Sequence, residues 1–169
     1  EAELLEYCHG VAGTIGLMTC PIFGVTDPDA LQHADDLGIA MQLTNICRDV
    51  REDAENDRVY LPADFFGTPP SVSDLLSKDS KWVEETALVK RRLLSLAEAR
   101  YASGEAGIGY LPFRMRIVVR WAGRMYREIG ELIRHDPASY HSERAVVKSG
   151  KKLRILLPSL GRAFLPRSS

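Results

Sequence analysis

The stretch Gln42-Leu43-Thr44-Asn45-Ile46-Cys47-Arg48-Asp49-Val50-Arg51-Glu52-Asp53 decides the fold class, because its polar and apolar residues alternate with a helical period. At about 100° per residue, one polar face of this helix spans roughly 80° of arc. That face carries Gln42, Asn45, Asp49 and Asp53. The surrounding helix is apolar, so the polar stripe is expected to face the protein interior. Buried polar groups need partners, and two neighbouring carboxylates without a cation repel each other.

A divalent cation is one partner that would suit this stripe. Mg²⁺ binds carboxylate oxygens and usually keeps several waters and substrate phosphates as further ligands. Carboxylates one helical turn apart can hold such an ion, which then stabilises a diphosphate as a leaving group. A second interpretation is that Asp49 and Asp53 form ion pairs on a solvated face. Their partners would then be Arg48, Arg51 and Arg58. The spacing alone leaves both interpretations open.

Helical periodicity extends along nearly the whole chain. The pattern predicts helices over residues 4–20, 28–54, 73–101, 112–135 and 142–157, and a loop rich in Pro and Gly over 56–73. Asp27 is the expected N-cap of the second helix, and Pro28 is its expected first residue. In the first helix, Gly10, Gly13 and Gly16 recur at spacing three, which allows close approach of a neighbouring backbone or a ligand. No convincing strand run is present, so the fold class is all-α.

The composition limits the classes of partner. The 169 residues carry a formal net charge of −1, which suits one domain and gives no electrostatic basis for nucleic-acid binding. The three cysteines match no zinc spacing and are expected to be buried, reduced thiols of a cytoplasmic protein. The first residues lack the basic region of a signal peptide. We expect them to continue a helix that begins upstream.

The C-terminal tail differs from the rest of the chain. After Glu143 no acidic residue remains, whereas lysines and arginines alternate with leucines and isoleucine. One interpretation is a basic and apolar segment that contacts an anionic membrane, peripherally on its inner face. The other is a packed helix with a solvated face, followed by a frayed end. The sequence gives no indication of the oligomeric state.

Two long segments resemble signatures of the squalene/phytoene synthase family. They are Tyr7-Cys8-His9-Gly10-Val11-Ala12-Gly13-Thr14-Ile15-Gly16-Leu17-Met18 and residues 40–53, the latter continuing to Arg58-Val59-Tyr60-Leu61-Pro62. Weaker matches occur at Leu111-Pro112, at Tyr126-Arg127-Glu128-Ile129 and from Glu143-Arg144 to Lys151-Lys152. The resemblance covers essentially the whole chain and is strongest to bacterial phytoene and dehydrosqualene synthases. It implies that residues 1–169 form the C-terminal portion of a single isoprenoid (class I terpene) synthase helical bundle, here without its N-terminal helices.

The resemblance implies a Mg²⁺-dependent prenyltransferase, with Mn²⁺ as a substitute metal. Members of this family condense two prenyl diphosphates head to head through a cyclopropyl diphosphate. The expected reaction converts geranylgeranyl diphosphate to phytoene through prephytoene diphosphate, which is the first step of carotenoid biosynthesis. The alternative substrate is farnesyl diphosphate, which would give presqualene diphosphate, dehydrosqualene or squalene. We expect no reduction by NADPH, because bacterial carotenoid-type members stop at the unreduced polyene.

The resemblance also implies roles for individual residues. Asp49 and Asp53 match the second aspartate-rich motif and would bind the metal together with Asn45, with Gln42 beside them at the diphosphate. Arg48, Tyr126 and Arg144 match positions that contact phosphate oxygens, and Tyr7 and Tyr60 match tyrosines near the reacting centre. Ala12, Gly13, Ile15, Gly16 and Leu17 match residues that line the prenyl tunnel.

Two features depart from the family pattern. The family usually has Arg-Gly-Arg before Val-Tyr-Leu-Pro, whereas this chain has Asn56-Asp57-Arg58, as in the dehydrosqualene pattern, so the product length stays open. The family also needs a first DxxxD motif on an N-terminal helix, and this sequence contains none. We therefore expect the chain alone to form part of the metal cluster at most, and to be inactive or barely active.

Two other classes of protein are alternatives to an active synthase of this family. A non-catalytic relative could serve as an assembly or scaffold protein, but such relatives tend to lose the metal-binding aspartates. Here Asn45, Arg48, Asp49, Asp53 and Tyr60 are all present, which favours an enzyme. Another class I terpene synthase is disfavoured by the segment Val11-Ala12-Gly13-Thr14 and by the order of the motifs.

Overall fold

The computed structural model describes residues 1–138, 145–147 and 150, and every regular element in these ranges is a helix. This confirms the predicted all-α class. The α-helices are α1 Ala2–Cys8, α2 Thr14–Ile22, α3 Pro28–Arg48, α4 Val50–Glu55, α5 Val72–Leu76, α6 Ser80–Gly107 and α7 Phe113–His135. A π-helical segment η1, His9–Gly13, joins α1 to α2, and short 3₁₀ helices lie at η2 Ala63–Phe65 and η3 Ile108–Tyr110. Among the described residues no helix is long and apolar enough to cross a membrane.

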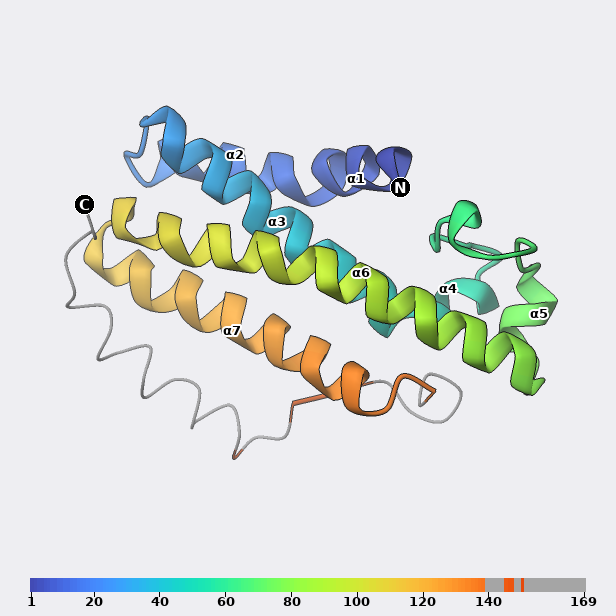
Figure 1. Cartoon of the computed structure of the whole chain (residues 1–169). Helices are drawn as coiled ribbons and strands as arrows, with labels where there is room; N and C mark the ends of the chain where they lie inside the picture. The colour runs from blue at the N-terminus through green and yellow to red at the C-terminus, as the bar shows by residue number, and fades with distance from the viewer. Residues whose placement is uncertain (139–144, 148–149, 151–169) are drawn as a thin grey trace.

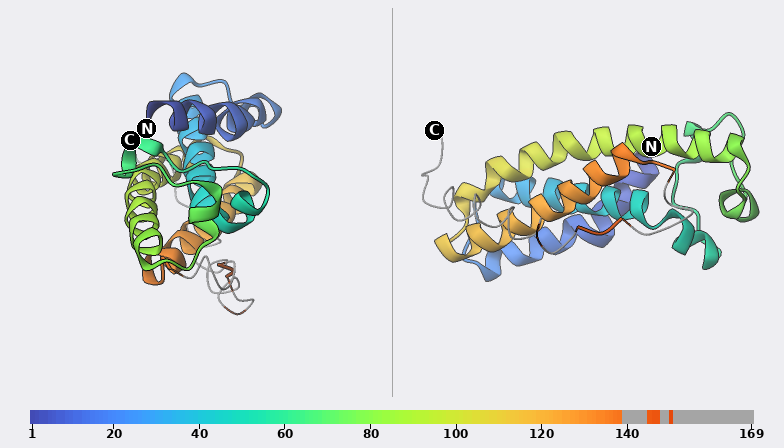
Figure 2. Two further views of the ribbon diagram at one scale, coloured as in Figure 1. Left: turned by 90° about the vertical axis from the view of Figure 1, so that its right-hand side faces the viewer. Right: turned by 90° about the horizontal axis from the view of Figure 1, so that it is seen from below.

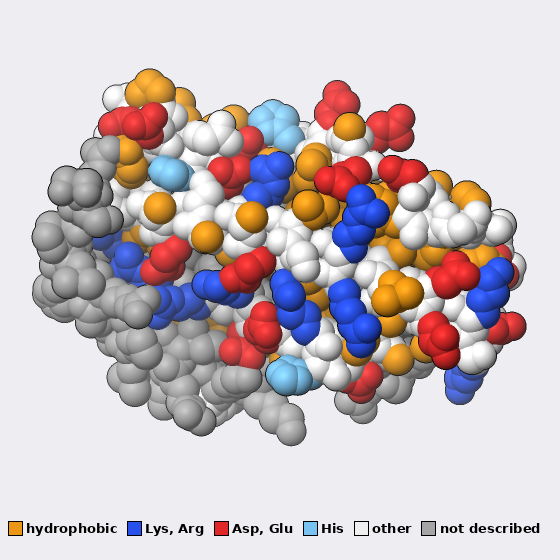
Figure 3. Space-filling model, viewed as in Figure 1, with side chains coloured by type: hydrophobic (Ala, Val, Ile, Leu, Met, Phe, Trp, Pro, Cys, Tyr) orange, Lys and Arg blue, Asp and Glu red, His pale blue; other side chains and the backbone are white. Residues whose placement is uncertain are grey.

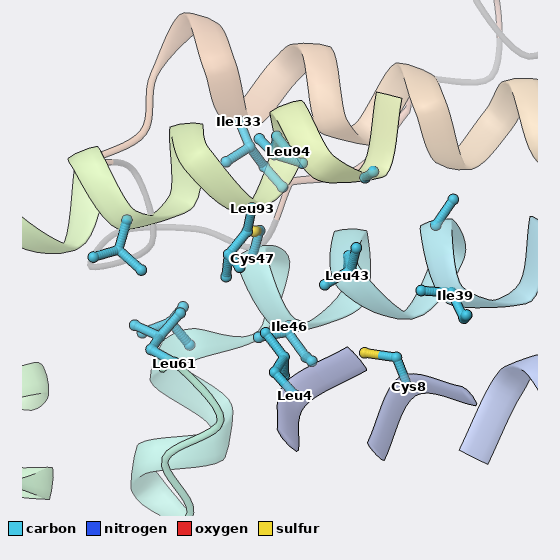
Figure 4. Packing of buried hydrophobic residues seen from close by; sticks show 14 of the residues in the cluster. Leu4, Cys8, Ile39, Leu43, Ile46, Cys47, Leu61, Leu93, Leu94 and Ile133 are labelled. Atoms are coloured by element: carbon cyan, nitrogen blue, oxygen red, sulfur yellow. The ribbon is translucent and has the colours of Figure 1, made fainter. Parts of the chain in front are cut away.

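Helix α3 lies at the centre of the molecule. It packs against α6 and α7 on one side and against the arm formed by α1, η1 and α2 on the other (Figures 1 and 2). Figure 4 shows the result in the core, where side chains of α3 lie between those of α1 below and α6 and α7 above. Leu43, Cys47 and Leu93 are fully buried there. This central helix is the one that carries the polar stripe, so its orientation is fixed from both sides.

The helix starts follow local sequence rules. The Asp27 carboxylate accepts a hydrogen bond of 3.0 Å from the Asp29 backbone N–H, and Pro28 is the first residue of α3, as predicted. Asp79 caps α6 in the same way, accepting from the backbone N–H of Lys81 at 2.9 Å. Each cap satisfies one of the backbone donors that the first turn of a helix leaves free.

Three predicted helices are interrupted. The helix expected over 4–20 contains the π-helical segment η1, and the helix expected over 28–54 is divided at Asp49. The helix expected over 73–101 is two helices, because Ser77 ends α5 and the side chain of Asp79 caps the start of α6, which continues to Gly107. The helix predicted over 142–157 lies almost entirely outside the described residues. Cys8, Cys20 and Cys47 are free and buried, as predicted.

The glycines of the first segment bring α2 and η1 close to α3. A Cβ atom at Gly16 would collide with the backbone carbonyl of Ala34, and one at Gly13 would collide with the carboxylate of Asp35. Small residues at spacing three therefore serve helix packing at these two positions. The close contact also brings the apolar side of α2 to the first half of α3.

Candidate active site

The polar stripe keeps its helical stacking although α3 ends at Arg48. The backbone N–H of Asp49 donates to the carbonyl of Asn45 at 2.9 Å, and that of Asp53 donates to the carbonyl of Asp49 at 2.8 Å. The backbone of Asp49 departs from ideal helical angles, with φ −103° and ψ 14°. Because the hydrogen bonds continue across this residue, Asn45, Asp49 and Asp53 remain on successive turns. The division of the predicted helix is thus a local distortion.

The side chain of Asn45 places a buried oxygen atom in the polar stripe. Its side-chain N–H donates to the Gln42 amide oxygen at 3.3 Å, which leaves the Asn45 amide oxygen Oδ1 as an acceptor. That oxygen is buried, and no described residue forms a hydrogen bond with it. An unpaired buried acceptor is costly, so such atoms in native proteins usually bind water, an ion or a ligand.

The donor set fits a hard divalent cation in part. Asn45 Oδ1 and the carboxylates of Asp49 and Asp53 are the oxygen ligands that Mg²⁺ prefers. Among the described residues, however, no group of three or more His, Cys, Asp and Glu side chains is placed to hold a metal ion. Two carboxylates and an amide oxygen would leave most of the six positions around Mg²⁺ to waters, phosphate oxygens or further protein groups.

Arg48 pairs with the first of these carboxylates. Its Nε and Nη2 atoms donate to the two oxygens of Asp49 at 2.8 and 2.6 Å, and both side chains are mostly buried. The hydrogen bonds with Asp49 raise the pKa of the Arg48 guanidinium above its usual value, and a hydrogen bond with Tyr126 adds to this effect. Tyr126 of α7 therefore lies at Arg48, and the contact of both with phosphate stays a prediction.

The ion-pair interpretation of the stripe is supported at Arg48. This residue pairs with Asp49 in a mostly buried setting and not on a solvated face. Arg51 pairs with Glu55 of its own helix, at 2.7 Å, and both of those side chains are about half exposed. Arg144, the remaining predicted phosphate ligand, lies outside the described residues.

Two tyrosines lie beside the second carboxylate. The rings of Tyr7 and Tyr60 are stacked, with centroids 5.1 Å apart and planes inclined by 22°. A hydrogen bond with Tyr60 raises the pKa of Tyr7 to about 12, and desolvation and the negative charge of Asp53 contribute. Both tyrosines line an open groove of about 1050 Å³ between α1 and residues 59–64. Tyr7 is therefore a neutral phenol at physiological pH.

An apolar cavity lies toward the other end of α3. It has an empty volume of about 480 Å³ between α2, α3, α6 and the residues that follow α6. Its lining includes Gly16, Ala34, Leu37, Gly104 and Val119. The cavity and the polar stripe thus share one helix, with the apolar part near its start and the carboxylates at its end.

The predicted tunnel residues take different positions. Gly16 lines the cavity, whereas Gly13 is buried against Asp35 of α3. Ala12 and Leu17 are partly exposed, and Ile15 is 54% exposed. Their role as a prenyl-chain surface stays a prediction.

The sequence patterns did not indicate one buried contact behind the stripe. The Thr44 hydroxyl lies 2.8 Å from the Tyr101 hydroxyl and donates to the Ala40 carbonyl at 3.0 Å, with both side chains buried. Burial raises the pKa of Tyr101. The contact ties α3 to α6 one residue before Asn45. The presence of Thr44 within an apolar helical run indicated that its hydroxyl needs a partner, but helical periodicity could not identify that partner as Tyr101.

Comparisons with known proteins agree with this arrangement. The sequence profile of the family Squalene/phytoene synthase matches residues 1–151. The chain is 38% identical over 165 residues to a 15-cis-phytoene synthase of Enterobacter agglomerans, covering 98% of this chain and 56% of that protein. It is 40% identical over 170 residues to a phytoene synthase of Thermus thermophilus, covering 99% of this chain and 57% of that protein.

A solved structure shows the same fold. The chain superposes on a crystal structure of a dehydrosqualene synthase with a TM-score of 0.77 and 29% sequence identity, covering 95% of this chain and 56% of the other. This chain belongs to the squalene/phytoene synthase family, and its helices form part of an isoprenoid synthase bundle. It spans about half the length of the curated relatives that it matches.

Proposed function

We propose that this chain provides one half of the active site of a Mg²⁺-dependent head-to-head prenyl synthase, and that residues 1–169 are the C-terminal portion of that enzyme's single domain. The observation that carries the proposal is the stripe of Asn45, Asp49 and Asp53 on successive turns, with the Asn45 amide oxygen buried and unpartnered. Family membership supports the reaction class, and the relatives' names support phytoene as the product.

The stripe would hold the metal and the diphosphate. When bound, Mg²⁺ neutralises charge on the diphosphate and makes it a better leaving group. Asn45 Oδ1, Asp49 and Asp53 would be its protein ligands on this side. Arg48 already places a planar guanidinium at the same point, and such a group binds phosphate oxygens with two parallel hydrogen bonds. Arg48 would turn from Asp49 to the phosphate as the carboxylate takes up the metal.

The stacked tyrosines would serve the cationic part of the reaction. Loss of diphosphate from an allylic carbon leaves a carbocation, which needs surroundings that stabilise positive charge without attacking it. Tyr7 has a pKa of about 12, so it does not present a nucleophilic phenolate near neutral pH. The faces of aromatic rings attract cations, and Tyr7 and Tyr60 lie next to Asp53, where the diphosphate would leave.

The apolar cavity would take a prenyl chain. Leu37, which lines it, and Asp49, at the polar end, are twelve residues apart on α3, which corresponds to about 18 Å along a helix. An extended prenyl diphosphate lying along α3 would therefore place its head at the stripe and its tail in the cavity. Geranylgeranyl diphosphate is the proposed substrate, because the matched relatives are phytoene synthases at up to 40% identity. Farnesyl diphosphate is the alternative, since the matched structure is a dehydrosqualene synthase.

The test is to incubate the full-length synthase with geranylgeranyl or farnesyl diphosphate and Mg²⁺, with and without NADPH, and to identify the hydrocarbon by mass spectrometry. We expect phytoene from the C20 substrate and no effect of NADPH. A C30 product from the C15 substrate alone would replace the proposed substrate with the alternative. Absence of any hydrocarbon under all conditions would favour a non-catalytic scaffold. We also expect residues 1–169 alone to give little or no product, because the facing metal ligands are not among them.

A further inference from the structure

Helices α6 and α7 enclose a second polar recess on another face of the molecule. Lysine, arginine and acidic side chains alternate along the seam between these helices (Figure 3). Beneath the seam lies a recess of about 280 Å³, and three of its lining residues are the arginines Arg120, Arg124 and Arg127. On an α-helix these three positions fall within about 60° of arc, so their side chains point the same way.

The acidic groups nearby do not balance this positive charge. Glu105 of α6 accepts from Arg120 Nε at 3.0 Å and from Arg124 Nη2 at 3.3 Å, both through its Oε1 atom. Arg127 pairs with Glu98. Within these pairs, three guanidinium groups share two carboxylates of α6. Both partners lie on α6, so no acidic group of α7 contributes to these pairs.

One donor in the recess has no acceptor. The Arg120 side chain is 10% exposed, and its buried Nη1 atom has no hydrogen-bond partner among the residues that the structure describes. A buried guanidinium donor left unpaired costs free energy, and in native proteins such a group usually meets water or an anion. The buried Asn45 oxygen can accept a hydrogen bond or bind a cation, whereas the buried Arg120 Nη1 atom can donate to an anion. The two positions therefore suit ligands of opposite charge.

We propose that this recess is an anion site that binds a phosphate group, separate from the metal and diphosphate site. A guanidinium presents parallel N–H groups that match two oxygens of a phosphate, and Arg120 and Arg124 would supply them together. Tyr126, which reaches Arg48, lies about 120° around α7 from the arginine row, so the two sites use different faces of that helix. No metal ligand is needed at the recess, because the protein itself provides the positive charge.

The size of the recess limits the ligand to a small group. The enclosed space of the recess is about 20 Å³, which is room for about one water molecule, so a phosphate group would bind at the open mouth of the recess and a prenyl chain would not fit beside it. Leu37, Ile108 and Val119 line both this recess and the apolar cavity, so occupancy of one is positioned to affect the other. The phosphate could be free inorganic phosphate or diphosphate, or it could be the headgroup of an anionic lipid.

The experiment is isothermal calorimetry on the full-length protein in EDTA, which removes divalent cations from the aspartate site. Inorganic phosphate and inorganic diphosphate are titrated separately at constant ionic strength set with sodium chloride. We expect saturable binding of one anion per chain. Arg124→Gln should weaken it roughly tenfold, since a charge-assisted hydrogen bond is lost. Arg114→Gln, at an exposed arginine of the same helix outside the recess, should leave the affinity unchanged.

Two further arms complete the test. Arg120→Lys keeps the buried charge but loses the planar fork, so it should weaken binding while circular dichroism still shows a folded helical protein. Vesicles of phosphatidylcholine with phosphatidic acid are compared with phosphatidylcholine alone in a sedimentation assay, and loss of binding in Arg124→Gln would identify a lipid headgroup as the source. If neither anion nor anionic vesicles bind, or if Arg124→Gln changes nothing, the recess holds water only and the proposal is wrong. The Arg48→Gln variant must bind phosphate normally, because a weakened affinity there would assign the signal to the diphosphate site.

Discussion

The two halves of helix α3 provide their acidic side chains with different partners. In the first half, Asp35 pairs with His9 of η1 at 2.7 Å. Asp36 accepts from Arg100 and Ser103 of α6, each at 2.6 Å. In the second half, Asp49 pairs with the adjacent residue Arg48. Partners in the first half are thus distant in sequence, whereas the pair at Asp49 is local.

This difference separates carboxylates that join helices from the carboxylate that we propose to bind the metal. A pair between two helices holds them together, so breaking it costs stability. The pair between Arg48 and Asp49 joins neighbours in sequence, so breaking it separates no two helices, although Arg48 also meets Tyr126 of α7. The buried, unpartnered oxygen of Asn45 lies in the same second half. Long-range partners in the first half and a local pair in the second half therefore support the proposal that the metal and the diphosphate bind at the second half.

The largest expected effect is the loss of turnover when the second half is changed. In the full-length synthase, Asp49→Asn removes a proposed metal ligand while keeping the side-chain shape, and should lower kcat by roughly 10³-fold. Hydrocarbon formation at saturating Mg²⁺ measures this. Asp35→Asn is the matched control in the first half and should keep kcat within about threefold, because its carboxylate faces His9. Equal losses in both variants would remove the distinction between the halves.

Sequence reasoning succeeded where the cause is local. Asp27 and Pro28 start α3 as predicted, because a cap and a fixed proline φ act within one turn. Periodicity also placed Asn45, Asp49 and Asp53 on one face, since helical geometry depends on spacing alone. The sequence did not predict the division of the helix at Asp49. No proline or glycine lies there, and the backbone hydrogen bonds continue across this residue.

Sequence reasoning failed where the cause lies far along the chain. Periodicity shows which face of a helix is buried but not which residue meets it. The Thr44–Tyr101 contact joins residues 57 positions apart, and the Asp36–Arg100 pair joins residues 64 apart. The sequence likewise could not predict the unpartnered Nη1 atom of Arg120, because its burial depends on how α6 and α7 pack. Only the family resemblance linked Tyr126 with Arg48, as two residues expected to contact phosphate, because a family pattern carries information about tertiary contacts.

The next largest effect is a loss of stability when the first half is changed. Asp36→Ala leaves Arg100 and Ser103 without their acceptor in a mostly buried position, and should lower the free energy of unfolding by about 2–3 kcal/mol. Urea unfolding followed by circular dichroism measures the change. Arg51→Gln breaks the exposed Arg51–Glu55 pair of α4 and should cost no more than about 0.5 kcal/mol. A cost for Asp36→Ala as small as this control would contradict the structural role.

A smaller loss of stability is expected when the contact between Thr44 of α3 and Tyr101 of α6 is broken. Thr44→Val keeps the shape of the side chain but removes the hydroxyl that meets Tyr101 and Ala40, and should cost about 1–2 kcal/mol. Thr14→Val is the comparison, because the Thr14 hydroxyl bonds to Gly10 at an exposed position and should matter little. If thermal unfolding shows equal shifts for both variants, the buried contact does not fix α3 against α6.

The smallest effect concerns the buried lysine behind Cys47. Lys90 is 1% exposed and donates to the Pro137 carbonyl at 2.9 Å, and burial lowers its pKa to about 8 from a usual value near 10.5. Between these values the unfolded chain binds more protons than the folded one, so stability rises with pH. From pH 7 to pH 9 the free energy of unfolding should gain about 1 kcal/mol from this group.

The variant Lys90→Met isolates that contribution. It removes the titrating ammonium and keeps an apolar stem of similar length, so its free energy of unfolding should lack the gain seen in the wild type. Urea unfolding of both proteins at pH 7, 8 and 9 gives the difference directly, and other titrating groups cancel in the comparison. The thiol of Cys47 has a pKa raised to about 12 by burial, so it stays protonated across this range. Parallel pH curves for the two proteins would mean that Lys90 stays protonated in the folded state up to pH 9, as it does in the unfolded chain, so that burial does not lower its pKa and the back of the second half carries a positive charge.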